Sequence, residues 1–232
     1  MERRIFCFWT GNNELSENRL RNLDNMSIIS DISTVLITEN NLNEWLIEPL
    51  HPGYKYLSFV HRADYLRCYF MHFYGGGYCD IKHPGRSWLK AFNDIEKNEN
   101  IYINGYPEIS RSYGCVPRIH YDPDIHIDEN IDKLIHEDPG FRYLIGNSSY
   151  IARPKTDFTK EWYNNLLRLM DKKYNLLQKY PAKHPRDKYG VNGSQYPLRW
   201  PELLAEIFVP LIYKYHNHVM QTLPRINNNN YQ

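Results

Sequence analysis

The sequence predicts an α/β fold whose central sheet is mainly parallel and flanked by helices. Short runs of β-branched and aromatic residues alternate with longer segments in which apolar residues recur at helical spacing. This alternation is typical of βα units, and 232 residues suffice for one domain with a sizeable core. We expect a single domain over residues 1–225 and a disordered, asparagine-rich tail over residues 226–232.

The first three elements are a strand, a helix and a second strand. The run RIFCFW at 4–9 is β-branched and aromatic and precedes the loop signal TGNN, so it predicts a buried strand. Residues 16–26 predict a helix capped by Ser16. Its inward leucines are expected to be Leu15, Leu20 and Leu23. The run STVLIT at 33–38 predicts the second strand.

A long helix and a glycine run occupy the middle of the chain. Residues 40–50 predict a short amphipathic helix that two prolines stop. Residues 58–74 predict a helix, because their apolar residues recur at helical spacing. Three consecutive glycines at 75–77 end it, and strands are expected at 78–81 and 101–104.

The C-terminal half alternates in the same way. Residues 143–152 predict a strand pair or a strand with a bulge, and residues 158–180 predict the longest helix. The apolar face of that helix is expected to hold Trp162, Leu166, Leu169 and Leu176. A polar loop is expected at 181–197, followed by a helix or helix pair at 200–219, broken at Pro210.

Composition excludes several classes of protein. The formal net charge is +1, from 28 basic and 27 acidic residues, so nucleic acid is not an expected partner. The four cysteines are far apart and form no C-x-x-C pair, so neither a disulfide framework nor a zinc site is expected. The N-terminus lacks a long apolar run, which predicts no signal peptide or membrane anchor and a cytoplasmic protein, in a bacterial or viral-host cytosol.

Polar residues at two expected strand ends predict a binding crevice. In open α/β sheets, ligands bind at the carboxyl ends of the strands, which here are Thr10-Gly11 and Asp80-Lys82. Asp64 and Arg67 lie one helical turn apart on a helix that is otherwise apolar. A surface ion pair is one interpretation. The other is a pair of ligand contacts, with arginine suited to a diphosphate and aspartate suited to sugar hydroxyls.

The run ADYLRCYFMHFYGGGYCDIK (63–82) resembles the sugar-binding region of GT-A glycosyltransferases that carry a D-x-D motif, of the capsular-polysaccharide type. The family pattern is approximately D-x-x-R-x-x-x-L-x-x-x-G-G-x-Y-x-D-x-D. Weaker similarity includes IFCFWTG (5–11), which resembles the family's opening strand, and GNSSYIARP (146–154), which resembles the strand facing the acceptor. The resemblance implies a GT-A fold and transfer of a sugar from a UDP- or GDP-type donor to a glycan acceptor.

The resemblance also implies roles for individual residues. The nucleotide pocket and the donor contacts would comprise Phe8, Trp9, Thr10, Gly11, Asp64, Arg67, Gly76, Gly77, Asp80, Lys82 and Trp200. Asp80 would be the first acid of the D-x-D pair and would touch ribose and an Mn²⁺ or Mg²⁺ ion. Trp200 would lie near the diphosphate, at a loop-to-helix junction that could close as a lid.

Lys82 departs from the family pattern, because the second acid of the pair is normally an aspartate. Three alternatives follow. Lys82 neutralises the diphosphate in place of a metal. Alternatively, the metal is kept by Asp80, phosphates, water and another carboxylate such as Glu202. In the third alternative the chain is an inactive relative that binds a carbohydrate or nucleotide.

The residue that deprotonates the acceptor hydroxyl is not specified by any motif. Possible bases are Glu108, Asp122, Asp124, His126, Asp187 and Glu202. Glu202 and Asp80 are the catalytic candidates. The segment RIHYDPDIHID (118–128) alternates acids and histidines as a metal cluster would, but its strand-like alternation and its proline favour a solvated loop. The sequence thus predicts a hexosyl- or pentosyltransferase, retaining or inverting, with a non-catalytic binding protein as the alternative.

Overall fold

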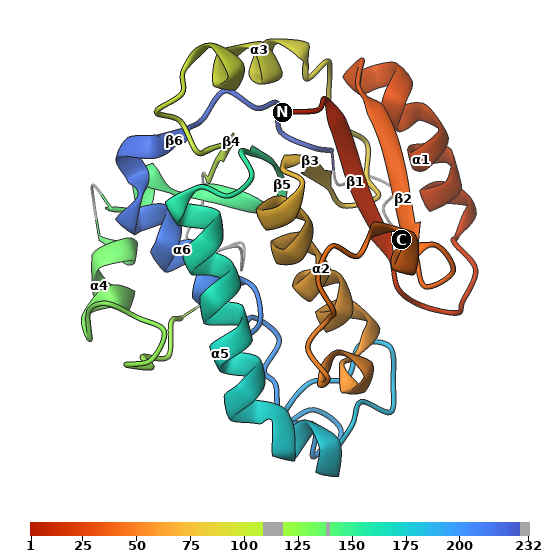
Figure 1. The fold of residues 1–232 in the computed structure, drawn as a ribbon, viewed down its shortest axis with the longest axis vertical. Helices are drawn as coiled ribbons and strands as arrows, with labels where there is room; N and C mark the ends of the chain where they lie inside the picture. The colour runs from red at the N-terminus through yellow and green to blue at the C-terminus, as the bar shows by residue number, and fades with distance from the viewer. Residues whose placement is uncertain (109–117, 138–139, 228–232) are drawn as a thin grey trace.

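The computed structural model describes residues 1–108, 118–137 and 140–227. They form an α/β fold with a six-stranded sheet (Figure 1). The strands are β1 (Arg4–Trp9), β2 (Ser33–Thr38), β3 (Gly76–Cys79), β4 (Ile103–Pro107), β5 (Ile145–Ala152) and β6 (Val219–Met220). The helices are α1 (Glu17–Ser30), α2 (Phe59–Phe73), α3 (Leu89–Lys97), α4 (Ile131–His136), α5 (Asp157–Lys179) and α6 (Ala205–Lys214).

The sheet is mixed and mostly parallel. Its strand order is β2-β1-β3-β5-β4-β6. β1 pairs in parallel with both β2 and β3, and β4 pairs in parallel with β6. β5 runs antiparallel to both of its neighbours, so it alone of these six strands has the opposite direction. The carboxyl ends of β1 and β3 therefore lie next to each other.

Helices cover both faces of the sheet, and alternate strand residues point into two separate cores. Phe6 and Phe8 of β1 pack with α2, α5 and α6, whereas Ile5 and Cys7 pack with α1 and α3. This alternation is the expected consequence of the two-residue side-chain period of a strand. Figure 1 shows α2 and α5 side by side on one face, and the two helices are in contact.

The helix expected at 58–74 is confirmed as α2, and Ser58 caps it by accepting a hydrogen bond from the backbone N–H of His61. Other expectations were wrong in detail. Residues 40–50 form only a short 3₁₀ turn, at Leu42–Trp45. Leu20 and Leu176, both expected to face the core, are each 46% exposed. Each lies within about one turn of the end of its helix.

Pro210 does not break the last helix as expected, because it lies inside α6. A proline has no N–H, so the carbonyl of the residue four positions earlier, Glu206, loses its helical hydrogen bond. His126 replaces that bond, with its Nε2 2.8 Å from the Glu206 carbonyl oxygen. A side chain from a distant loop thus satisfies the carbonyl and lets the helix continue.

The C-terminal segment is packed as far as residue 227. Ile226 is 4% exposed, and Asn227 donates a backbone hydrogen bond to the carbonyl of His83 at 2.9 Å. These two residues of the expected tail are therefore ordered, because they close over the segment that follows β3. The remainder of the tail lies outside the described residues. Within the described part of the chain, no helix is both long and apolar enough to span a membrane.

Candidate functional site

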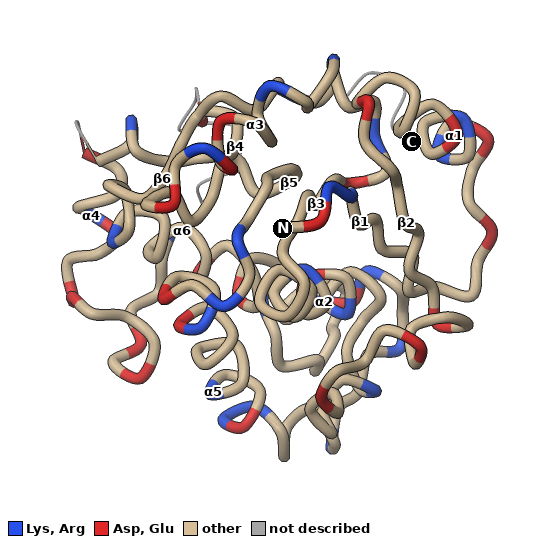
Figure 2. The backbone as a smooth tube through the Cα atoms, turned by 45° about the horizontal axis from the view of Figure 1, so that its top comes forward, with Lys and Arg blue, Asp and Glu red and all other residues tan. Residues whose placement is uncertain are grey.

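The site lies where β1 and β3 end and α2 begins. α2 leads back into β3, so its first turns lie beside the carboxyl end of that strand. Thr10, directly after β1, donates from Oγ1 to the carbonyl oxygen of Phe59 at 2.6 Å, which ties the end of β1 to the start of α2. Figure 2 shows basic and acidic residues on all sides of the sheet, in keeping with the formal net charge of +1. An anionic ligand must therefore be held by local cations.

Arg67 is the centre of a buried charge cluster at this position. Its Nη2 lies 3.1 Å from Oδ1 of Asp80 and 3.5 Å from Oδ1 of Asp64. Its Nη1 donates to the Asn147 carbonyl of β5 at 3.2 Å, and its guanidinium lies 4.5 Å from the centroid of the Tyr78 ring. The structure thus brings the predicted Asp64, Arg67 and Asp80 together. We call these residues, with Tyr78 and Lys82, the Arg67 cluster.

The two acids of the cluster have opposite pKa shifts. Burial raises the pKa of Asp64 to about 6, with Arg67 opposing the rise and Asp80 adding to it. Burial acts in the same sense on Asp80, but Arg67, Lys82 and Tyr78 outweigh it and hold the pKa of Asp80 below its usual value. At neutral pH both acids are ionised, and Asp64 is the one that gains a proton readily.

Lys82 and Asp80 contact each other directly. The Nζ of Lys82 lies 2.8 Å from Oδ2 of Asp80. The two residues were expected on a strand, but β3 ends at Cys79. A tight turn follows, in which the backbone N–H of Lys82 donates to the Asp80 carbonyl at 2.6 Å. The turn, rather than strand alternation, places the ammonium against the carboxylate.

The residues of the cluster do not fit the Mn²⁺ or Mg²⁺ ion that the resemblance implies. Such ions take about six oxygen ligands. Oδ1 of Asp80 accepts from Arg67 and from the Tyr78 hydroxyl, and Oδ2 pairs with Lys82. An ion at Asp80 would displace two cations of the chain itself. Among the described residues, no group of three or more His, Cys, Asp or Glu side chains could hold a metal.

The residues expected to line the nucleotide pocket are mostly packed. Phe8 is buried and stacks on Tyr78 with ring centroids 5.6 Å apart. Trp9 donates from its indole nitrogen to the Asn13 carbonyl at 2.7 Å, and Thr10 is held by Phe59. At Gly11 an added Cβ would lie 3.0 Å from the Phe59 ring. The side chains of this segment therefore shape the end of β1 through contacts within the chain.

Gly76 and Gly77 lie at the opposite end of β3 from Asp80. Asp80 comes four positions after Gly76, which corresponds to about 13 Å along a strand. Gly76 has a φ of +85° and packs on the Arg4 carbonyl, while Gly77 packs on Ile5 and Trp88. The two glycines therefore let β3 pack closely on its neighbours, and they lie at a distance from Asp80, with which they were expected to share a site.

Trp200 lies near the start of α2, where it contacts the ring of His61. The His61 ring is 6.5 Å from the Trp200 ring and lies one helical turn before Asp64. Its Nε2 is 3.2 Å from the Arg199 carbonyl, so Nε2 carries the proton and Nδ1 accepts from the Tyr196 hydroxyl at 2.9 Å. Burial lowers the pKa of His61 to about 4, so this connection is uncharged at neutral pH. Trp200 itself is 39% exposed.

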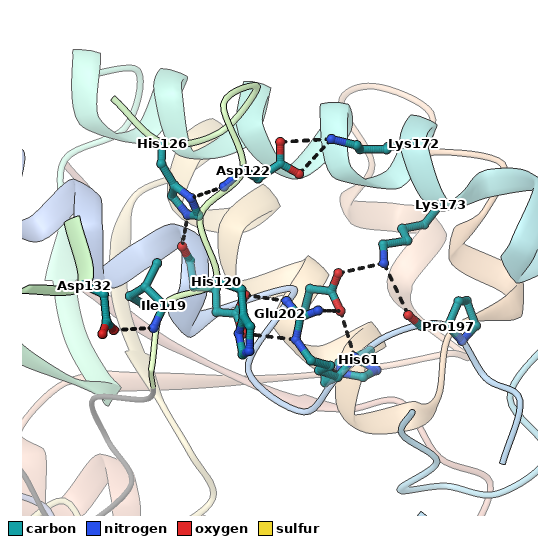
Figure 3. Close-up of polar contacts among 12 residues, drawn as sticks. His61, Ile119, His120, Asp122, His126, Asp132, Lys172, Lys173, Pro197 and Glu202 are labelled. Carbon is teal, nitrogen blue, oxygen red and sulfur yellow. Dashed lines mark hydrogen bonds and ion pairs between the residues drawn. The ribbon is translucent and has the colours of Figure 1, made fainter. Parts of the chain in front are cut away.

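Glu202 belongs to a separate polar cluster between α5 and α6 (Figure 3). Its Oε1 pairs with Lys173 at 2.9 Å and its Oε2 accepts from the backbone N–H of Arg199 at 2.8 Å. The neighbouring cavity, of about 180 Å³, is also lined by His120, Asp122 and His126. Residues 118–128 form the expected loop. Both oxygens of Glu202 are thus engaged by neighbours outside the Arg67 cluster.

Tyr150 and His61 were not singled out from the sequence. The hydroxyl of Tyr150 and the Nε of Arg67 are both buried, and neither has a hydrogen-bond partner among the described residues. Tyr150 lies in the run 146–154, whose resemblance to an acceptor-facing strand was a usable signal. His61 carried no such signal, because Tyr196 and Arg199, which link it to Trp200, lie more than 130 positions away.

Comparisons of the chain with models of protein families, with curated proteins and with solved structures find no match. The case for a function therefore rests on the chemistry of the site.

Proposed function

We propose that the chain is a GT-A-like glycosyltransferase that moves a hexosyl or pentosyl group from a nucleotide-sugar donor, UDP- or GDP-linked, to a glycan acceptor. One observation carries the proposal: two cations, Arg67 and Lys82, converge on Asp80 just beyond the carboxyl end of β3. This is the position at which open α/β sheets bind their ligands. The motif of residues 63–82 supplies the class of ligand.

The leaving group of such a transfer is a nucleoside diphosphate. The bond between the anomeric carbon and the diphosphate oxygen breaks, a bond to the acceptor hydroxyl forms, and the hydroxyl proton passes to a base. A buried guanidinium and ammonium stabilise the charge that develops on the diphosphate. The Nε of Arg67 is buried and lacks a hydrogen-bond partner within the described chain. In this proposal Lys82 supplies the charge that a metal would otherwise supply.

The two carboxylates orient the donor. Asp80 is held ionised by Arg67, Lys82 and Tyr78, so it accepts hydrogen bonds from ribose or sugar hydroxyls. Asp64 lies one turn earlier on α2 and reaches the same guanidinium. The neutral His61 beside it holds Trp200 at the edge of the site.

The test is thermal unfolding with UDP-, GDP- and dTDP-sugars, each in Mn²⁺ and in EDTA. We expect at least one nucleotide sugar to stabilise the folded chain equally in both conditions. At a concentration of 100 Kd the gain is about 2.7 kcal/mol. Lys82→Ala should weaken that binding at least tenfold, whereas Lys90→Ala, an exposed lysine on α3, should not change it. No shift with any nucleotide would reject the proposal, and strict Mn²⁺ dependence would reject the role of Lys82.

A binding protein of the same fold, without catalysis, is the second candidate. It is favoured by the engagement of both Asp80 oxygens and both Glu202 oxygens by the chain itself, which leaves no free carboxylate at these two positions to act as a base. The two candidates are separated by incubating the chain with the nucleotide sugar that stabilises it, with and without a glycan acceptor, and measuring the release of nucleoside diphosphate. Binding without any release would select the second candidate.

A further inference from the structure

The loop between α5 and α6 encloses a basic cleft, which is distinct from the Arg67 cluster. Its cavity has a volume of about 550 Å³ and is lined by residues between Lys179 and Tyr196. This volume lies within the range of about 300–1,000 Å³ that is usual for small-molecule sites. We call it the loop cleft.

Charge in the loop cleft is strongly unbalanced. Its basic lining residues are Lys179, Lys183, Arg186 and Lys188. The acid that lines it, Asp187, is 8% exposed and accepts a hydrogen bond from the backbone N–H of Lys183 at 3.0 Å. Of the described carboxylates, none forms an ion pair with any of the four cations. These positive charges therefore repel one another around an open cavity.

The loop cleft is held in shape by backbone hydrogen bonds, one of them to the first turn of α2, one to the short turn before α2 and one within the loop itself. Ala182 donates to the Tyr56 carbonyl at 3.0 Å, and Val60, in the first turn of α2, donates to the Pro185 carbonyl at 3.3 Å. Tyr189 donates to the Leu198 carbonyl at 2.8 Å. The cations are thus presented by a fixed backbone, which lowers the ordering cost of binding a ligand between them.

The four cations divide into two pairs. Arg186 and Lys188 lie over the Trp200 ring, 5.4 and 5.0 Å from its centroid. Lys179 and Lys183 contact neither Trp200 nor the Arg67 cluster through any interaction described for this chain, and both are exposed. The second pair can therefore be changed without disturbing the proposed donor site.

We propose that the loop cleft binds a phosphate-bearing ligand. A neutral hydroxylated ligand has no need of four cations that lack an ion-pair partner, whereas a phosphate or diphosphate offers several acceptor oxygens and a charge of opposite sign. The ligand is either a soluble phosphate compound or a phospholipid headgroup, since both present the same anion. The proposal is independent of the glycosyltransferase assignment.

The test is a calorimetric titration of the 232-residue chain with inorganic pyrophosphate at near-physiological salt. We expect saturable binding that weakens at least tenfold in Lys179→Ala/Lys183→Ala. The control pair Lys97→Ala/Lys133→Ala, with the same change in charge elsewhere, should bind like the unmodified chain. Lys82→Ala should also keep its affinity, which separates this site from the proposed donor site.

A parallel experiment measures cosedimentation with vesicles of neutral lipid, with and without phosphatidic acid. If the chain binds the vesicles with phosphatidic acid but not the neutral ones, and the Lys179→Ala/Lys183→Ala variant binds neither, the ligand is a lipid. If the chain binds pyrophosphate instead, the ligand is a soluble compound. Absence of both, or affinity that falls with Lys82→Ala but not with the cleft variant, would overturn the proposal.

Discussion

Two carboxylates share one guanidinium in this protein, yet their pKa values move in opposite directions. Asp80 contacts Arg67, Lys82 and the Tyr78 hydroxyl, so favourable charge interactions exceed the cost of burial. Asp64 has Arg67 alone among those partners, at 3.5 Å, and burial dominates. The number of hydrogen-bonded partners, rather than depth of burial, thus decides which acid holds its proton more tightly.

This difference predicts a specific pH dependence. Because the folded state raises the pKa of Asp64 to about 6 from 3.8, the folded chain binds more protons than the unfolded chain between those values. The contribution of Asp64 to stability is therefore complete below pH 4 and is lost as the pH rises through 6, by about 3 kcal/mol at 1.36 kcal/mol per pKa unit. Asp64→Asn should remove this loss.

Urea denaturation from pH 4 to pH 7 measures the effect. The free energy of unfolding of Asp64→Asn, relative to the unmodified chain, should increase across this interval. Asp24→Asn, at an exposed position of α1, is the control and should give a curve parallel to that of the unmodified chain. A parallel curve for Asp64→Asn as well would show that Asp64 titrates normally.

Among the elements, the junction of α2 and β3 depends on glycine for two separate reasons. Gly75 has a φ of +65°, a conformation that residues with a Cβ rarely adopt. A Cβ there would also lie 2.4 Å from the Pro154 ring and 2.8 Å from the Ala152 carbonyl oxygen. Gly75 therefore serves the contact between α2, β3 and the end of β5, at a distance from the Arg67 cluster.

Gly75→Ala and Gly190→Ala form a matched pair that separates these reasons. Gly190 has a φ of +75° but has no atom within 4 Å of an added Cβ. We expect Gly190→Ala to destabilise the fold by about 1–2 kcal/mol through backbone strain alone. Gly75→Ala should cost a further 1–3 kcal/mol or so through overpacking. Equal losses in the free energy of unfolding would contradict the packing role.

The whole molecule is divided by its sheet into two cores, and cysteines lie deep in both. Cys68 is in the core that holds α2 and α5, while Cys7 and Cys79 are in the core that holds α1 and α3. All three are free thiols with 0% exposure. Burial raises the pKa of Cys68 and Cys79 well above the ordinary value, so little reactive thiolate is present.

Thiol reactivity consequently reports on global unfolding. In a Cys115→Ser variant, which removes the cysteine outside the described residues, the native chain should react with a disulfide-exchange reagent only as fast as it unfolds. In denaturant, the three remaining thiols should all react. Ser27→Cys, at an exposed position of α1, should add one fast-reacting thiol. Fast reaction without that substitution would mean that one core opens independently.

The meeting of Asp64 and Arg67 with Asp80 was implied by the resemblance of residues 63–82. Sequence pattern alone determined the alternation of strands and helices, the helix at 58–74 with Asp64 and Arg67 on one face, and the closeness of the strand ends at Thr10 and Asp80. These features follow from local periodicity and from the rule that parallel strands end at one edge of a sheet. Short elements were missed, such as the two residues of β6, because so few residues carry no detectable period.

The tertiary structure decided everything that depends on distant partners. It placed Lys82 against Asp80, moved the glycines away from the site, put Glu202 among residues of α5 and α6, and gathered four cations at the loop cleft. The physical reason is that charge pairing and pKa depend on distances of a few ångströms between atoms. Residues as far apart in the chain as His61 and Tyr196 reach such distances only after the helices have packed on the sheet.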